Sequence, residues 1–334
     1  MTVEQSIVEE IKNADKIVIT SHRSADGDSI GSSVAMMKFI ETLGKKAQIC
    51  HPDPCPDYLK WATNEISIFD FETAPDLVTN YLIESDLIFC LDYNGANRLG
   101  NEMGQVLENS SGKKVMIDHH PFPQDFVDIA ISEPTVCSTC ELIYELIDKS
   151  GNKNRLNQEI ATPIYLGLMT DTGSFRFSNV KARTHEILSD LLNTGMNHTK
   201  VHENTFDNNR IDRLKLRGYA TSEKLELIDG YPVAIMALSE SDLNKFNYIK
   251  GDTEGLVNIA LSVEGVKAAI FMAEKDNAVK LSFRSKDDIA VNVIASENFE
   301  GGGHTNAAGG ISFESLEVTI AKVKSLIPKY FNPA

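Results

Sequence analysis

Residues 16–40 read KIVITSHRSADGDSIGSSVAMMKFI and predict a buried strand, a polar turn and then a helix. The segment KIVITSH (16–22) is short, apolar and rich in β-branched residues, which is typical of a buried strand. After the turn, apolar residues recur at helical spacing from Ile30 to Ile40, and Gly44 ends the pattern. Such a strand–turn–helix unit is a building block of parallel α/β sheets.

Three further segments carry the same apolar strand signature, namely AQIC (47–50), DLIFCLD (86–92) and KKVMID (113–118). Helical patterns follow at 138–149 and 157–170. Because parallel strands need crossover connections that are usually helices, the alternation predicts an α/β fold with a mostly parallel sheet.

The character of the chain changes between residues 181 and 226, which are polar and helix-prone and show no strand signal. The segments YPVAIMAL, VKAAIFMAE and AVKLSFRS then predict strands of a smaller α+β domain. With 334 residues, the chain is long enough for two domains. We therefore predict a catalytic α/β domain over 1–185, a helical connector over 186–226 and a substrate-binding α+β domain over 227–334.

The composition, 42% hydrophobic and 24% charged, is that of a soluble globular protein. No apolar run approaches the roughly 20 residues that span a bilayer, so we expect no membrane association. The N-terminus lacks the layout of a signal peptide, which favours a cytoplasmic location. The formal charge of −16 argues against tight binding to long nucleic acid, which needs many Lys and Arg residues on phosphates.

The five cysteines have no framework spacing, which fits reduced cytosolic thiols better than disulfides. Cys137 and Cys140 form a CxxC pattern, which is compatible with a redox or zinc site. No second pair accompanies them, and an amphipathic segment follows. We therefore interpret them as buried residues at the start of a helix.

Polar residues lie where predicted strands end, at His22, Asp92 and Asp118. Ligands of open α/β sheets bind outside the carboxyl ends of the strands, so we expect these side chains to converge. A lone histidine or Asp-Gly turn would be ordinary turn chemistry. Burial of several carboxylates without cations, however, would cost on the order of several kcal/mol each. Mixed carboxylate and imidazole ligands suit Mn²⁺, with Mg²⁺, Co²⁺ or Zn²⁺ as alternatives.

These motifs resemble those of the DHH phosphoesterase superfamily. The HxxxDGDxxGS turn, the isolated strand-end aspartate, the DHH triplet (118–120) and the DTGSFRF aspartate appear in the family's order. LSFRS (281–285) and GGGHTNAAGG (301–310) resemble the DHHA1 substrate-binding domain. Together with EGLVNIALSVEGVKAAIFMAE (254–274), they are similar to the bifunctional oligoribonuclease and 3′-phosphoadenosine-5′-phosphate phosphatase group.

The resemblance implies two divalent cations, Mn²⁺ before the others, with Asp92 as the bridging ligand and a hydroxide between the metals as the nucleophile. One cation would be held by His22, Asp26 and Asp92. The other would be held by Asp28, Asp92, His119 and Asp171.

Further roles follow from the same resemblance. His120 would serve as donor or general acid at the scissile phosphate, and Asp118 would orient its neighbours. Arg98 is a phosphate clamp in this interpretation and a surface ion-pair residue in the alternative. In the C-terminal half, a guanidinium fork, hydroxyls and a glycine-rich anion cradle would bind the distal nucleotide. These substrate contacts are Ser282, Arg284, Ser285, Gly301, Gly302, Gly303 and His304.

Two positions depart from the family pattern. Ser24-Ala25 stands where Asn-Pro is usual, and Glu300 stands where a fourth glycine is common. We expect the first change to cost only turn rigidity. The second places a carboxylate beside the predicted anion site, so it could alter substrate preference.

The function that these features predict is hydrolysis of very short oligoribonucleotides such as pApA, and of 3′-phosphoadenosine-5′-phosphate to AMP. The partners would be short RNA and nucleoside bisphosphates, and the default assembly is a homodimer. An exopolyphosphatase or inorganic pyrophosphatase shares the DHH half, but the SFRS and GGGH motifs argue against it. A catalytically inactive nucleotide sensor is disfavoured because every predicted metal ligand is present.

Overall fold

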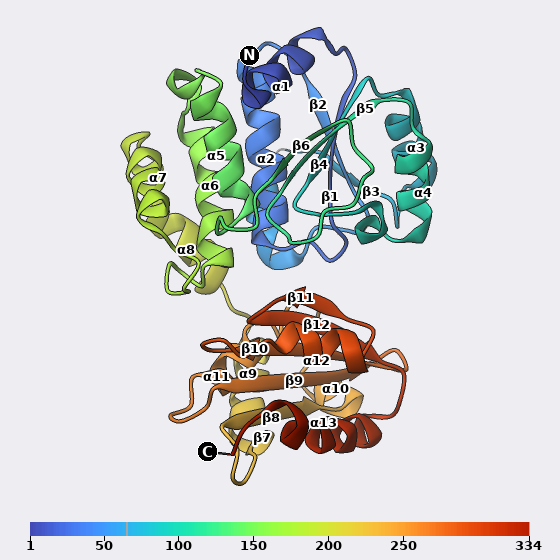
Figure 1. Cartoon of the computed structure of the whole chain (residues 1–334), viewed down its shortest axis with the longest axis vertical. Coiled ribbons are helices and arrows are strands. Elements are labelled where there is room, and N and C mark those ends of the chain that lie inside the picture. Colours follow the sequence, from blue (N-terminus) through green and yellow to red (C-terminus); the bar gives the residue numbers. More distant parts are fainter. Residues whose placement is uncertain (65, 334) are drawn as a thin grey trace. The chain divides into compact units, whose positions relative to one another are not determined.

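A six-stranded sheet forms the centre of each of the two units into which the chain divides (Figure 1). The first unit comprises Met1–Asn208 and the second begins at Asn209. The computed structural model describes residues 1–64 and 66–333. Among those residues, none of the helices is long and apolar enough to cross a membrane.

The first sheet is entirely parallel and has the strand order β3-β2-β1-β4-β5-β6. From β1 the chain adds strands toward one edge of the sheet, and from β4 it adds strands toward the other edge. The connections that leave these two central strands therefore run in opposite directions. A crevice for ligands opens at such a switch point. The strands are β1 (Ile17–Ser21), β2 (Ala47–His51), β3 (Ile68–Asp70), β4 (Leu87–Leu91), β5 (Lys113–Asp118) and β6 (Ile129–Ser132).

Helices cover both faces of this sheet (Figure 1). Alternate residues of β1 and β4 therefore enter different cores, and both strands are buried along their whole length. One face carries α1 (Val3–Asn13), α2 (Gly27–Thr42), α5 (Thr139–Lys149) and α6 (Gln158–Asp171), and the other carries α3 (Pro75–Glu84) and α4 (Asn101–Asn109). The unit also contains α7 (Ala182–Asn193), α8 (His198–Phe206), η1 (Asp57–Thr63), η2 (Ala96–Leu99) and η3 (Lys153–Arg155).

The second sheet is mixed and has the order β11-β12-β10-β9-β8-β7, with β8 and β9 parallel and the other pairs antiparallel. Its strands are β7 (Leu225–Leu227), β8 (Val233–Leu238), β9 (Ala268–Lys275), β10 (Ala278–Ser285), β11 (Gly302–His304) and β12 (Ala307–Ser312). The helices of this unit are α9 (Ile211–Glu223), α10 (Glu240–Lys245), α11 (Leu256–Leu261), α12 (Val291–Asn298) and α13 (Leu316–Tyr330).

The structure confirms the α/β class and the parallel N-terminal sheet. One local expectation differs. The segment expected to lack strands overlaps β7, whose three residues are too few for a periodic signal. The glycine run 301–303, which is predicted to form an anion cradle, includes Gly302 and Gly303 of β11. A Cβ on Gly303 would lie 2.5 Å from the Ala307 carbonyl oxygen, so glycine permits this close strand pairing.

Helices α2 and α6 approach closely at Gly31, where an added Cβ would lie 2.5 Å from the carbonyl oxygen of Pro163. Because a backbone atom cannot swing aside, we predict that Gly31→Ala lowers the free energy of unfolding by about 1–3 kcal/mol. Denaturant unfolding measures this loss. The control is Gly218→Ala in α9, where an added Cβ meets nothing within 4 Å. That change should be neutral or stabilising, and equal destabilisation by both variants would contradict the explanation.

Candidate metal centre

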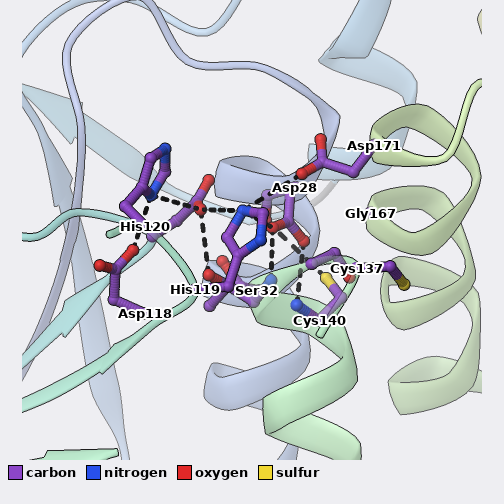
Figure 2. Close-up of polar contacts among 12 residues, drawn as sticks. Asp28, Ser32, Asp118, His119, His120, Cys137, Cys140, Gly167 and Asp171 are labelled. Carbon is purple, nitrogen blue, oxygen red and sulfur yellow. Dashed lines mark hydrogen bonds and ion pairs between the residues drawn. The ribbon is translucent and has the colours of Figure 1, made fainter. Parts of the chain in front are cut away.

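The predicted ligands converge at the carboxyl ends of the central strands. His22 directly follows β1, Asp92 directly follows β4, and the DHH triplet begins at Asp118, the last residue of β5. Two helix ends add carboxylates, because Asp26 and Asp28 lie at the start of α2 and Asp171 ends α6. Figure 2 shows part of this cluster, in which side chains from separate elements point toward one another.

His22, Asp26 and Asp92 form the first group. The Nε2 atom of His22 lies 3.3 Å from Asp92 Oδ2 and 3.8 Å from Asp26 Oδ2. One ligand atom from each of the three residues lies within 4.8 Å of the other two. Burial opposes protonation of His22, but the hydrogen bond to Asp92 and the charge of Asp26 outweigh it and raise its pKa to about 9.

Asp28, His119 and Asp171 form the second group. The Nε2 atom of His119 lies 3.3 Å from Asp171 Oδ2 and 3.9 Å from Asp28 Oδ2. Ligand atoms of these three residues also lie within 4.8 Å of one another. Asp28 is completely buried, and His119 is 6% exposed.

Asp92 contacts both groups, one with each carboxylate oxygen. Its Oδ2 faces His22, and its Oδ1 lies 3.6 Å from His119 Nε2. The residue has a φ of 65°, which is uncommon for a non-glycine residue. Its amide donates to the Ile117 carbonyl at 3.0 Å, which ties this turn to the neighbouring strand. Asp92 is therefore placed as a bridge between two ligand sets.

Burial and neighbouring carboxylates raise the pKa values of two aspartates in this cluster. Burial, followed by the charge of Asp92, raises the pKa of Asp28 well above its ordinary value. Burial likewise raises the pKa of Asp171 to about 6. Burial opposes protonation of His119, yet its hydrogen bond to Asp171 raises the pKa to about 10. Oxygen-rich ligands with imidazole fit hard or borderline divalent cations, which would relieve this repulsion.

Asp118 and His120 form a pair beside the two groups. His120 Nδ1 lies 2.7 Å from Asp118 Oδ1, and also 3.7 Å from Asp92 Oδ1. Asp118 is completely buried, and its Oδ2 has no hydrogen-bond partner among the described residues. The pair fixes the orientation of the His120 ring.

Arg98 lies in η2, and its side chain is exposed. Its carbonyl accepts a hydrogen bond from the Arg23 amide at 2.9 Å, so η2 is held against the turn that follows His22. The guanidinium charge is near enough to oppose protonation of His22. The structure thus places Arg98 beside the first group.

Asp53 is a positioning residue that the sequence did not reveal. Ser24 has a φ of 61°, and its amide donates to Asp53 Oδ1 at 2.9 Å. Asp53 is 2% exposed and holds the turn between His22 and Asp26 in this uncommon conformation. Asp53 lies within HPDPCP (51–56), a sequence typical of an ordinary loop with several prolines, so no local pattern indicated its role.

The predicted substrate residues all lie in β10 and in the segment that contains β11. Ser285 is buried, donates to the Ile289 carbonyl at 2.6 Å and accepts from Asn306 Nδ2 at 2.9 Å, which indicates a structural role. Arg284 Nη1 donates to the Phe283 carbonyl at 2.9 Å. The remaining predicted residues are Ser282, in β10, and Gly301, Gly302, Gly303 and His304, around the edge strand β11.

Residues 16–168 match the DHH family, N-terminal domain, and residues 230–328 match the DHHA1 domain. A solved exopolyphosphatase-related protein from Bacteroides fragilis is 36% identical, with a TM-score of 0.93, and the match covers 98% of this chain and 96% of that one. The chain belongs to the DHH family. As a DHH family member, it is a hydrolase whose acidic and histidine groups are placed for metal binding.

Two curated relatives of this DHH protein share one name, bifunctional oligoribonuclease and PAP phosphatase NrnA. The protein from Thermus thermophilus is 29% identical over 88% of this chain and 83% of its own length. The protein from Bacillus subtilis is 24% identical over 97% of this chain and 98% of its own length. The likeness therefore extends over both units of the chain.

Proposed function

We propose that this protein hydrolyses phosphoester bonds of short nucleotides with the help of two divalent cations, Mn²⁺ before Mg²⁺, Co²⁺ or Zn²⁺. The observation that carries the proposal is the position of Asp92, whose two carboxylate oxygens face two separate ligand groups. When bound, a pair of cations neutralises charge on the phosphate and lowers the pKa of an attacking water.

The proposed ligands of the first cation are His22, Asp26 and Asp92. The second cation would take Asp28, His119 and Asp171, and share Asp92. This assignment is supported by the two groups of ligand atoms, each gathered within 4.8 Å. Both groups mix carboxylate oxygen with imidazole nitrogen, the donor set that Mn²⁺ accepts readily.

His120 is the proposed proton donor to the leaving oxygen. Its Nδ1 is engaged by Asp118, so Nε2 is the ring nitrogen that would transfer the proton. Asp118 acts through His120 and is a positioning residue. Arg98 contributes a positive charge beside the first group and would contact a phosphate oxygen of the substrate.

The proposed substrates are very short oligoribonucleotides such as pApA, and 3′-phosphoadenosine-5′-phosphate. The names of the Thermus thermophilus and Bacillus subtilis relatives support this choice. A net charge of −16 agrees with short substrates, because it leaves little cationic surface for a long polyanion. Arg284, Ser282 and the amides of the edge strand β11 would supply the contacts to a phosphate or base edge.

Exopolyphosphatase activity is the second candidate. It is favoured by the description of the Bacteroides fragilis protein, which is similar to this chain along nearly its whole length. Both candidates use the same metal centre, so they differ in the leaving group and in the contacts beyond the scissile phosphate.

Product analysis on pApA, 3′-phosphoadenosine-5′-phosphate, pyrophosphate and long-chain polyphosphate separates the candidates. We predict that metal-free protein is inactive and that added Mn²⁺ restores release of AMP from the first two substrates. Asp92→Ala should abolish this release, because both cations lose a shared ligand. Activity confined to polyphosphate or pyrophosphate would reject the nucleotide assignment and leave the metal centre intact.

Asp118→Asn tests the role of the Asp118–His120 pair. We predict a fall in kcat of roughly 10- to 100-fold, with little change in KM or in Mn²⁺ affinity, because the ring of His120 loses its fixed orientation. Steady-state kinetics and calorimetric metal titration measure these effects. The control is Asp76→Asn, an exposed carboxylate at the start of α3, which should behave as wild type. Unchanged kcat in Asp118→Asn would contradict the assignment.

Arg284→Lys tests the substrate contacts of the second unit. Lysine keeps the charge but removes the two-pronged donor, so we predict that KM for pApA rises several-fold while Mn²⁺ affinity is unaffected. Lys280→Ala, on the same strand, removes an exposed charge and serves as the control. If the two variants have the same KM as wild type, Arg284 does not bind the nucleotide.

A further inference from the structure

The N-terminal end of α5 contacts a carboxylate of the second ligand group. Asp28 Oδ2 accepts a hydrogen bond from the Thr139 amide at 2.6 Å. Asp28 Oδ1 accepts one from the amide of Cys140, which lies beside Asp28 in Figure 2, at 2.9 Å. These amides belong to the first turn of the helix, where backbone N–H groups lack partners inside the helix. The helix end therefore satisfies both oxygens of a carboxylate that is completely buried.

The hydroxyl of the same threonine contacts the bridging aspartate. Thr139 Oγ1 donates to Asp92 Oδ1 at 3.0 Å, the oxygen that lies 3.6 Å from His119 Nε2. Thr139 is completely buried. One residue thus binds two carboxylates, Asp28 through its backbone and Asp92 through its side chain, although these come from α2 and from the turn after β4.

The surroundings leave Asp28 little room for another orientation. Gly167 of α6 is also so close that an added Cβ would lie 2.5 Å from Asp28 Oδ1. The first turn of α5 is stabilised by Ser138, a buried N-cap whose hydroxyl accepts from the Glu141 amide at 3.2 Å. Residue 139 and its helix therefore contact the carboxylates of both Asp28 and Asp92.

We propose that Thr139 is a positioning residue for the metal centre, which aligns the bridging carboxylate of Asp92 with that of Asp28. The inference rests on the proposed function, because it takes these aspartates as cation ligands. Ligands held by outer hydrogen bonds bind metal more tightly than unsupported ones, and loss of such a partner typically costs about 10- to 100-fold in affinity or activity.

Thr139→Val tests the inference with little change of shape. Valine removes the hydroxyl that binds Asp92 and keeps both amide contacts to Asp28. We expect Mn²⁺ to bind the metal-free variant 10- to 100-fold more weakly in a calorimetric titration. At saturating Mn²⁺, we expect a larger fold-change in kcat than in KM. The variant disturbs the geometry of the bridging carboxylate and leaves the substrate contacts in place.

Two further variants make the outcome decisive. Thr139→Ser keeps the hydroxyl and should restore Mn²⁺ affinity to within a few-fold of wild type. Thr205→Val removes a buried hydroxyl that donates to the Val201 carbonyl within α8, and should bind Mn²⁺ normally. Wild-type Mn²⁺ affinity in Thr139→Val, or equal loss in Thr139→Ser, would overturn the inference. If the wild-type protein itself binds no Mn²⁺, the proposed function fails instead.

Discussion

The two-sided contact of Asp92 is the interaction on which the proposed chemistry depends. Asp92 sits after β4, beside the point where the strand order of the first sheet reverses. Its left-handed backbone turns the side chain so that each oxygen faces a different ligand group. A conformation that is uncommon for aspartate persists because the Asp92 amide and carboxylate are both held by neighbouring elements. The switch point of the fold thereby becomes the proposed site of two cations.

The remaining architecture offsets the cost of burying so many carboxylates in one place. Imidazoles of His22 and His119 lie against them, and the helix end at Thr139 directs its amides to Asp28, which is completely buried. The side chains of His22, Asp92 and His119 are themselves buried, and low exposure to water strengthens each of these charge contacts. Burial, with a smaller contribution from the charge of Asp26, nevertheless raises the pKa of Asp171 to about 6.

The sequence was sufficient to predict the strands that carry the site, because apolar β-branched runs such as 16–22 end at polar residues. It also indicated which of those residues would meet, since carboxyl ends of parallel strands share an edge. Thr139 and Asp53 escaped prediction because their contacts join segments distant along the chain. The pairing of β11 with β12 was not predicted, because a glycine run signals close backbone approach without indicating whether a ligand or another strand approaches.

Counting bound ions tests the central claim most directly. Metal-free protein would be titrated with Mn²⁺, the bound ions per chain would be counted at saturation, and Asp92→Ala would be treated in parallel. If Asp92 bridges two sites, wild-type protein binds two ions per chain, and the variant loses tight binding at both. One ion in the wild type, or two tightly bound ions in Asp92→Ala, would contradict the bridged centre.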